Sequence, residues 1–335
     1  MKQSLLSWLS CPQCRGTLSL SEAKSSDDKI ESGSLDCAQC KNRYPIIRSI
    51  PRFVPQDNYA GSFGFQWNRF RQTQLDSYSG LDISRDRFLR STGWNPELLT
   101  GKTILDVGCG AGRFVEAALS FGAQVFAIDY SQAVEACFSN FPNHPNLHVL
   151  QADIYTLPFK GECFDYVYCL GVLQHTPDPH QAFNALPSQL KPGGYIAVDV
   201  YQAGLRNLLH SKYWFRHLTT RIPRSNLFQS IERSMPFVLP ISRGLGRIPA
   251  VGNLLKRFIP VANYEGIYPL NEEQLHEWAV LDTFDMLSPT YDNPQTPQTL
   301  HSWLTGVGLE EIEVGKFAHL VGRGRKPVKE AVPCA

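Results

Sequence analysis

Short apolar runs alternate with helix-compatible stretches through the middle of the chain. Five of these runs have the length of a strand: Thr103–Val107, Gln124–Ile128, Leu147–Leu150, Phe164–Leu170 and Tyr195–Val200. The fourth is apolar almost without interruption, which is typical of a strand buried on both faces. Arg113–Phe121, between the first two runs, has a pattern compatible with a helix. A strand followed by a helix and a second strand predicts a doubly wound α/β fold.

The pattern continues toward the end of the chain. Residues 299–306 predict a helix, and Glu310–Gly315 and Phe317–Gly322 predict two strands joined by a tight turn. Residues 324–335 look like a loose, flexible polar tail. Lys191–Gly194 reads K-P-G-G, which predicts a turn ahead of the fifth strand.

A glycine turn follows the first strand directly. Gly108, Gly110 and Gly112 allow the backbone to come close to a ligand at the carboxyl end of that strand. The spacing is G-x-G-x-G, with Arg113 where the dinucleotide fingerprint has its third glycine, so no pyrophosphate cradle is implied. Asp106, at the end of the strand, would repel a phosphate but suits a ligand that carries an ammonium and a sulfonium.

The stretch T-I-L-D-V-G-C-G-A-G-R-F resembles motif I of the class I S-adenosylmethionine-dependent methyltransferases. The core is similar to methyltransferase type 11 proteins and to the ubiquinone/menaquinone C-methyltransferases. This resemblance implies a Rossmann-like, seven-stranded class I sheet, whose antiparallel sixth and seventh strands are the two closing strands. The K-P-G-G turn matches the same family.

The resemblance also implies the residues that hold S-adenosylmethionine. Asp129 ends the second strand about 20 residues after the glycine turn, where an acid accepts hydrogen bonds from ribose hydroxyls. Tyr130 is then a wall for the adenine, Asp153 in Q-A-D-I holds its amino group, and Ile154 packs on the ring. The cofactor residues expected are Asp106, Gly108, Cys109, Gly110, Gly112, Asp129, Tyr130, Asp153, Ile154 and Leu170.

The loop after the fourth strand supplies a candidate base. His175 lies in this loop, at the carboxyl edge of the sheet, and either removes a proton from a hydroxyl acceptor or only packs there. Residues 282–294 resemble a stretch near the end of related bacterial enzymes, so Asp285, Tyr291 and Asp292 are candidates for acceptor contact. An Asn/Asp-Pro-Pro-aromatic motif, expected for amino methylation, does not follow the fourth strand. We therefore expect O- or C-methylation of a small-molecule, saccharide or lipid-linked acceptor.

Two C-x-x-C pairs near the start predict a structural zinc ion. Cys11, Cys14, Cys37 and Cys40 supply the four thiolates of a closed tetrahedral site, with 22 residues between the pairs. The polar stretch Ser21–Ser34 reads as a loop between hairpins, and Pro45–Pro55 as an extended connector. The segment is similar to the zinc-ribbon leaders of bacterial methyltransferases and to the small zinc-ribbon activator of tRNA methyltransferases. Loss of the metal is expected to loosen only residues 1–55.

The aromatic cluster Phe63–Phe70 stands on a predicted helix ahead of the glycine turn. Simple packing is the first interpretation of this cluster. The alternative, from the resemblance, is that Gln66 and Trp67 help to cover the cofactor.

Charge is distributed unevenly although the net charge is only +1. Between Tyr201 and Ala262 there are ten Lys/Arg and one acid, Glu232, so this stretch carries +9 and the rest of the chain −8. This basic stretch lies in an insertion after the fifth strand, residues 201–290, and such a segment outside the regular core suits a lid over an acceptor. Cations beside aromatic residues fit an anionic small molecule, an anionic membrane surface or RNA, or simply a solvated helical face.

These observations divide the chain into a zinc ribbon with its connector (1–57), a cofactor-binding domain (58–323) and a tail (324–335). An RNA methyltransferase and a non-enzymatic cofactor-binding scaffold remain as alternatives to the small-molecule enzyme. No apolar run approaches the roughly 20 residues of a membrane span and no export signal is evident. We therefore expect a cytoplasmic protein, either free or peripheral to a membrane.

Overall fold

The computed structural model describes residues 1–335 except 27–28, 56–57, 205–210, 250, 318 and 329–335. Its centre is a seven-stranded sheet with the order β10-β11-β9-β8-β5-β6-β7. In it β11 pairs antiparallel with both β10 and β9, and the other neighbouring strands pair parallel. The strands are β5 (Thr103–Val107), β6 (Gln124–Asp129), β7 (Leu147–Gln151), β8 (Phe164–Cys169), β9 (Leu190–Val200), β10 (Glu310–Lys316) and β11 (Leu320–Arg325). This is the predicted class I arrangement.

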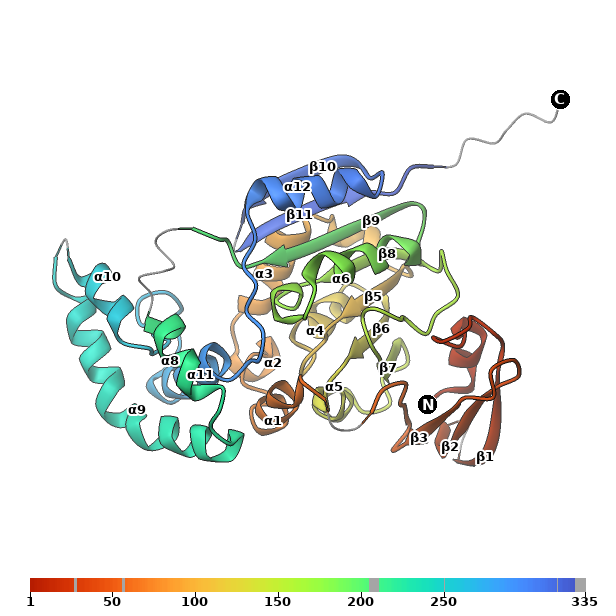
Figure 1. Ribbon diagram of the computed structural model, residues 1–335, viewed down its shortest axis with the longest axis horizontal. Coiled ribbons are helices and arrows are strands. Elements are labelled where there is room, and N and C mark those ends of the chain that lie inside the picture. The colour runs from red at the N-terminus through yellow and green to blue at the C-terminus, as the bar shows by residue number, and fades with distance from the viewer. Residues whose placement is uncertain (27–28, 56–57, 205–210, 250, 318, 329–335) are drawn as a thin grey trace.

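Helices cover both faces of this sheet, as Figure 1 shows. One face packs against α3, α4 and α5 through a core that includes Phe88, Phe114 and Val134. The other packs against α6 and α12 through Phe183 and Leu300. The helices of this layer and its connections are α1 (Gly61–Arg69), α2 (Asp76–Ser79), α3 (Ile83–Thr92), η2 (Pro96–Leu99), α4 (Arg113–Ser120), α5 (Ala133–Asn140), η3 (Leu173–His175), α6 (Pro179–Ala185), η4 (Pro187–Gln189) and α12 (Pro297–Gly306).

The start of the chain forms a separate antiparallel sheet of four strands. After η1 (Gln3–Trp8) come β1 (Leu18–Ser26), β2 (Lys29–Cys37), β3 (Arg43–Ile47) and β4 (Ile50–Pro51), hydrogen-bonded in that order. The prediction of a loop over Ser21–Ser34 is wrong, because the described part of this stretch is a long hairpin. Among the described residues of Ser21–Ser34, only Ile30 and Ser34 are buried, so this mostly polar sequence resembles that of a loop. Part of the expected connector is also strand, with Ile46 paired to Pro51.

This N-terminal ribbon shares its core with the large sheet. The Trp8 ring lies 4.7 Å from Phe126 and 6.1 Å from Phe164, between centroids. Leu5, Leu9 and the ribbon strands belong to the same buried cluster as β6 and β8. The ribbon is therefore packed against the sheet and is not an independent domain. This contact argues against the expectation that loss of the metal loosens only residues 1–55.

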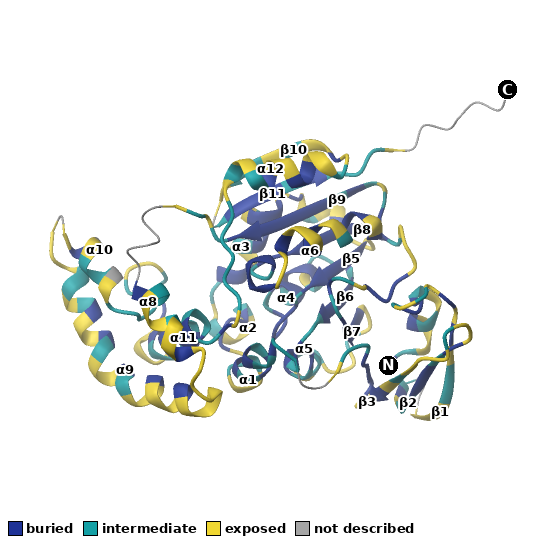
Figure 2. Ribbon diagram, viewed as in Figure 1, coloured by how far each residue is buried: buried dark blue, intermediate teal, exposed yellow. Residues whose placement is uncertain are grey.

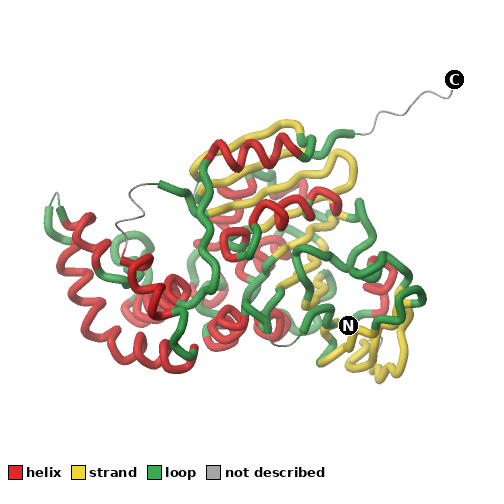
Figure 3. The backbone as a smooth tube through the Cα atoms, viewed as in Figure 1, coloured by secondary structure: helices red, strands yellow, loops and turns green. Residues whose placement is uncertain are grey.

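The insertion after β9 folds into helices, as expected. They are α8 (Ser211–Thr219), α9 (Arg224–Gly246), α10 (Gly252–Leu255), η5 (Lys256–Phe258) and α11 (Glu272–Leu287). They gather at the end of the molecule opposite the ribbon, as the tube in Figure 3 and the ribbon in Figure 1 show. Helix α11 packs on α9 through Phe284 and Phe228, whose rings lie 5.8 Å apart, and its other residues reach the carboxyl edge of the sheet. We call α8, α9, α10 and η5 the helical lobe.

Two predicted boundaries near the sheet need correction. The K-P-G-G turn is part of β9: Leu190 pairs with Phe164 and Tyr195 with Tyr166, so Lys191–Gly194 bulges out of a strand that begins earlier. The predicted start of the polar tail at residue 324 is also wrong, because Gly324 and Arg325 belong to strand β11 and pair with β9. The remaining tail residues 329–335 lie outside the described part of the chain.

Within the described residues, no helix combines the length and the apolar character needed to cross a membrane.

Candidate functional site

The glycine turn lies tightly packed at the carboxyl end of β5. The backbone N–H groups of Gly108 and Cys109 both donate to the carbonyl of Ile128, at 2.8 and 2.9 Å, which joins the turn to β6. Gly108 has a φ of +87°, and a Cβ there would come within 2.2 Å of Val172. A Cβ on Gly110 would meet the Trp67 indole at 3.2 Å. The turn is thus held between the loop after β8 and helix α1, and only glycine fits at its start.

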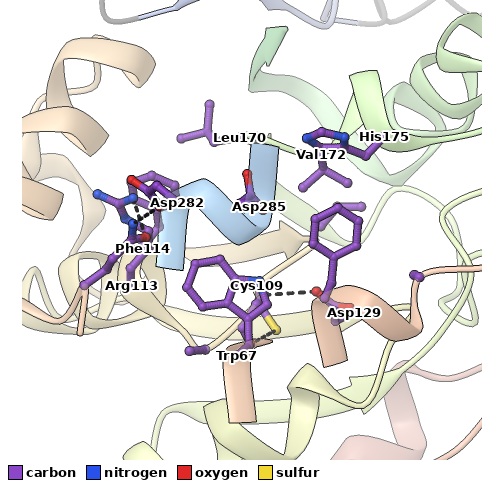
Figure 4. A pocket seen from close by; sticks show the side chains of 18 of the residues that line it. Trp67, Cys109, Arg113, Phe114, Asp129, Leu170, Val172, His175, Asp282 and Asp285 are labelled. Carbon is purple, nitrogen blue, oxygen red and sulfur yellow. Dashed lines mark hydrogen bonds between the residues drawn. The ribbon is translucent and has the colours of Figure 1, made fainter. Parts of the chain in front are cut away.

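Asp129 ties the end of β6 to this turn. Its carboxylate accepts from Gly110 N at 3.0 Å and from the backbone N–H and hydroxyl of Ser131 at 2.8 and 2.7 Å. Burial raises the pKa of Asp129, and these hydrogen bonds act in the opposite direction. Figure 4 shows this carboxylate beside Cys109 and Trp67 in the cavity.

A cavity of about 410 Å³ opens beside the turn. Of the predicted cofactor residues, those on its wall are Gly108, Cys109, Gly110, Asp129, Tyr130, Ile154 and Leu170. Trp67 is on the wall too, so the structure supports cover by this residue, whereas Gln66 is buried and donates to Asp285 at 2.9 Å. The Asp129 carboxylate can accept hydrogen bonds from the ribose hydroxyls, and the apolar walls suit the adenine. The glycine turn lets the backbone come close to the methionine part of S-adenosylmethionine. The donor set therefore suits this cofactor.

Three predicted cofactor residues are not part of the wall. Asp106 is only 2% exposed and accepts from the Tyr168 hydroxyl at 2.8 Å. Burial raises its pKa to about 8, so at neutral pH it offers no full charge to a cationic ligand. Asp153 accepts from Tyr155 N at 3.0 Å, and Gly112 packs against Cys137 and Phe141. Cofactor contacts by these residues stay predictions.

His175 lies on the wall of the cavity at the end of η3. Its Nδ1 is 2.9 Å from the carbonyl oxygen of Tyr291. Because a carbonyl oxygen only accepts, Nδ1 carries a proton, so in the uncharged form of the ring the lone pair is on Nε2. The ring is fixed between Phe63 and Tyr201, with centroids 5.2 and 5.4 Å away. This tautomer has the form that a general base requires.

The three predicted acceptor residues have different places. Asp285 lines the cavity, as predicted for an acceptor contact. Tyr291 is not part of the wall; it supplies the carbonyl for His175, and its ring meets Tyr59 edge-on at 5.4 Å. Asp292 is buried in an ion pair with Lys212, at 2.9 Å, and so holds the lobe instead of facing an acceptor.

No local sequence pattern predicts the buried polar network at one side of the cavity (Figure 4). Arg87 pairs with Asp199 at 3.1 Å, and its Nε has no hydrogen-bond partner among the described residues. Arg113 donates to Gln74 at 2.6 Å, and burial lowers its pKa to about 10. Asp282 on α11 accepts from Gln74 at 3.2 Å and from the Tyr264 hydroxyl, and burial raises its pKa to about 6. Figure 4 shows Arg113 and Asp282 together on one side of the cavity. These six residues come from six different elements and loops.

The four ribbon cysteines converge on one point, as predicted. The Sγ atoms of Cys11 and Cys40 are 3.6 Å apart, those of Cys14 and Cys37 3.4 Å, and all four lie within 4.8 Å of one another. Four thiolates at 2.3 Å from one zinc ion would be about 3.8 Å apart. The cluster fits a structural Zn²⁺ and leaves no open ligand position.

Comparisons with known proteins agree with this geometry. Residues 105–198 match the family described as "Methyltransferase domain", and residues 2–49 match "Trm112p-like protein". The "Ubiquinone biosynthesis O-methyltransferase" of Coxiella burnetii is 31% identical over 126 residues, which cover 36% of this chain and 54% of that protein. The protein of the same description from Pseudomonas paraeruginosa is 32% identical over 130 residues, 38% of this chain and 56% of its own length.

The chain thus spans about half the length of the curated relatives it matches. Among solved structures, human N-acetylserotonin methyltransferase in complex with S-adenosylmethionine superimposes with a TM-score of 0.45 at 15% identity, over 82% of this chain and 61% of that one. On the sequence matches and the sheet order, the chain carries a class I methyltransferase domain behind a Trm112p-like, four-cysteine ribbon.

Proposed function

We propose that this chain transfers a methyl group from S-adenosylmethionine to an oxygen atom of a small acceptor held in the cavity. The observation that carries the proposal is that one cavity joins the expected cofactor residues to a candidate base and to the insertion. Its wall includes the glycine turn and Asp129 together with His175 and with Asp285 and other residues of α11. We infer that the glycine turn and Asp129 mark the cofactor half, and that His175 and α11 mark the acceptor half.

The bound cofactor would supply an activated methyl group on a sulfonium. The chain then has to align the acceptor, exclude water and remove one proton. The His175 ring lines the cavity and is fixed through its Nδ1 by the Tyr291 carbonyl, so Nε2 takes no part in that bond. This geometry favours a hydroxyl acceptor over a carbon, and the curated relatives are described as O-methyltransferases.

The acceptor half is both apolar and polar. Tyr264, Tyr268, Trp278 and Met286 give it broad apolar walls, while Asp282 and Arg113 stand among them. Most of this lining comes from the insertion, so the insertion closes the acceptor side. An acceptor with an apolar ring or chain and a polar group fits such walls.

The test begins with binding. S-adenosylmethionine and S-adenosylhomocysteine should bind the purified chain in isothermal titration calorimetry, and nicotinamide dinucleotide should not. A labelled methyl group should then enter a small extractable product from a cell extract. Dinucleotide binding in place of S-adenosylmethionine would overturn the proposal.

RNA methylation is a second candidate, favoured by the Trm112p-like match and by the basic insertion. In that case the label would enter RNA, and binding to RNA would weaken steeply with added salt. Label in a small product without RNA binding would refute this candidate.

A further inference from the structure

Most of the large apolar side chains that are exposed among the described residues lie in or next to the helical lobe. Sixteen large apolar side chains are recorded as exposed among the described residues, and eleven of them lie between Trp214 and Ile267. They are Trp214, Phe215, Leu218, Ile222, Phe237, Ile241, Ile248, Val251, Leu254, Phe258 and Ile267. Such a concentration marks an interaction surface, because single exposed apolar residues are normally scattered.

Helix α9 is apolar on two opposite sides. Leu227, Ile231 and Met235 are buried on the side that packs toward α11. Phe237 is 72% exposed and Ile241 56% exposed, one turn apart on the other side. Figure 2 shows buried and exposed positions alternating along this helix. A water-facing helix would carry polar residues at these outer positions.

Other elements of the lobe also expose aromatic residues. Trp214, Phe215 and Leu218 are exposed on α8, and the Trp214 ring lies 6.0 Å from Phe258 of η5. Trp and Phe side chains beside cations are typical of helices that lie in a membrane interface.

Charge complementarity indicates the partner. The stretch Tyr201–Ala262 has ten Lys/Arg and one acid. Arg221, Arg224 and Arg233 are exposed, and none of them has a carboxylate partner among the described residues. We propose that the outer surface of the helical lobe binds an anionic lipid bilayer, with its apolar side chains in the headgroup region and its arginines on the lipid phosphates.

The chemistry of this surface favours lipid over nucleic acid. Nucleic-acid interfaces are polar and strongly positive, and their apolar contacts are mainly aromatic rings that stack on bases. Ile241, Ile248 and Leu254 have no such role, yet they are 56%, 42% and 49% exposed. Aliphatic and aromatic residues together with cations fit the boundary between lipid headgroups and acyl chains.

Bilayer binding also explains the position of the lobe. Its α9 packs on α11, and α11 supplies Trp278, Asp282 and Met286 to the cavity. A lipid-linked acceptor would therefore meet the lobe and the acceptor half of the cavity together. Only this last link rests on the proposed methyl transfer; the binding surface itself does not.

Vesicle flotation tests the proposal with the full chain. The wild type should float with vesicles of phosphatidylcholine and phosphatidylglycerol and much less with phosphatidylcholine alone, and added salt should weaken the binding. Phe237→Glu with Ile241→Glu should lower the vesicle affinity by about tenfold or more, since two apolar contacts are replaced by charges that the lipid repels. Thermal unfolding and S-adenosylmethionine binding should stay at wild-type values, because both positions lie outside the cavity.

The matched control is Leu98→Glu with Val328→Glu, two residues that are each 60% exposed outside the lobe. This variant should float like the wild type. Equal loss in both variants, or a wild type that never floats, would overturn the proposal. The proposal would also be overturned if fluorescence anisotropy showed that the binding of labelled single-stranded RNA depends on Phe237 and Ile241 while the binding of vesicles does not. Sedimentation velocity showing a dimer that the lobe variant dissociates would assign the surface to a second copy instead.

Discussion

The carboxylate of Asp129 is the most informative single group to change. It holds the glycine turn through Gly110 N at 3.0 Å and the start of the next loop through Ser131 at 2.8 and 2.7 Å. It is also the group assigned to the ribose hydroxyls. Asp129→Asn keeps the volume of the side chain but turns one acceptor oxygen into a donor nitrogen, so it separates hydrogen bonding from packing.

The magnitude follows from the bonds at stake. Asparagine can accept from either Gly110 or Ser131 but not from both, so one buried donor loses its partner, which costs about 1–3 kcal/mol of folding stability. Each hydrogen bond from a ribose hydroxyl to the carboxylate is worth roughly 1.5–3 kcal/mol because the acceptor is charged. Loss of about 3 kcal/mol over two such bonds weakens binding on the order of 100-fold.

Isothermal titration calorimetry with S-adenosylmethionine measures the affinity, and urea unfolding measures the stability. The matched control is Asp165→Asn at the amino end of the sheet. Asp165 also accepts from a backbone N–H and a hydroxyl, both of Thr103, at 2.9 and 2.7 Å, but it lies far from the cavity wall. The control should lose stability and keep its affinity. An Asp129→Asn protein that binds the cofactor as the wild type does would refute the ribose assignment.

Three further predictions concern other parts of the molecule. Because burial raises the pKa of Asp106 to about 8 from 3.8, the folded chain keeps a proton that the unfolded chain releases, so stability should fall as pH rises from about 4 to about 8. Asp106→Asn should remove this loss. Urea unfolding of both proteins at pH 5 and pH 8 measures it, and an equal change in the free energy of unfolding in the two proteins would contradict the prediction. His175→Asn keeps a donor for the Tyr291 carbonyl but has no Nε2; kcat should fall about 100-fold or more at unchanged cofactor affinity, and near-normal turnover would exclude the base role. Cys37→Ser should release the zinc and increase hydrogen exchange in β7 as well as in the ribbon. Metal analysis measures the zinc, and mass spectrometry measures the exchange. An increase in exchange confined to residues 1–55 would show that the ribbon is independent of the sheet.

The central sheet was predictable because its signals are local. Strands β5 and β8 are apolar runs bounded by turns, and the structure places β5 at the predicted residues. The cysteine cluster was predictable for the same reason, since each C-x-x-C pair is itself a turn. The hairpin of β1 and β2 lacked such a signal, because most of its described side chains are not buried. Gly324 and Arg325 are strand residues only because β9 supplies their partners.

The acceptor half of the cavity could not be predicted from local patterns. Arg87 stands on α3 among polar residues, and only the fold brings it to Asp199 at the end of β9. Gln74 connects Arg113 to Asp282 although these three residues lie far apart in the chain. Position along the strands indicated Asp106 and Asp153 as ligand residues, but position does not say which way a side chain points. Both carboxylates are bonded within the protein and are not part of the cavity wall.

The contact between the ribbon and the sheet gives the zinc ion a role in the methyltransferase domain. Strand β7 is the edge of the large sheet, and an uncovered edge is prone to pair with other chains. The segment after β4 covers this edge: Phe53 N donates to the Gln151 carbonyl at 2.8 Å, and the Arg52 guanidinium donates to the Gln151 side chain at 3.0 Å and pairs with Glu135. Gln151 in turn donates to the carbonyl of Tyr130, beside the cofactor half of the cavity, at 3.0 Å. The four-cysteine cluster fixes the ribbon that presents Arg52 and Phe53, so removal of its metal should affect the cofactor site as well as the ribbon.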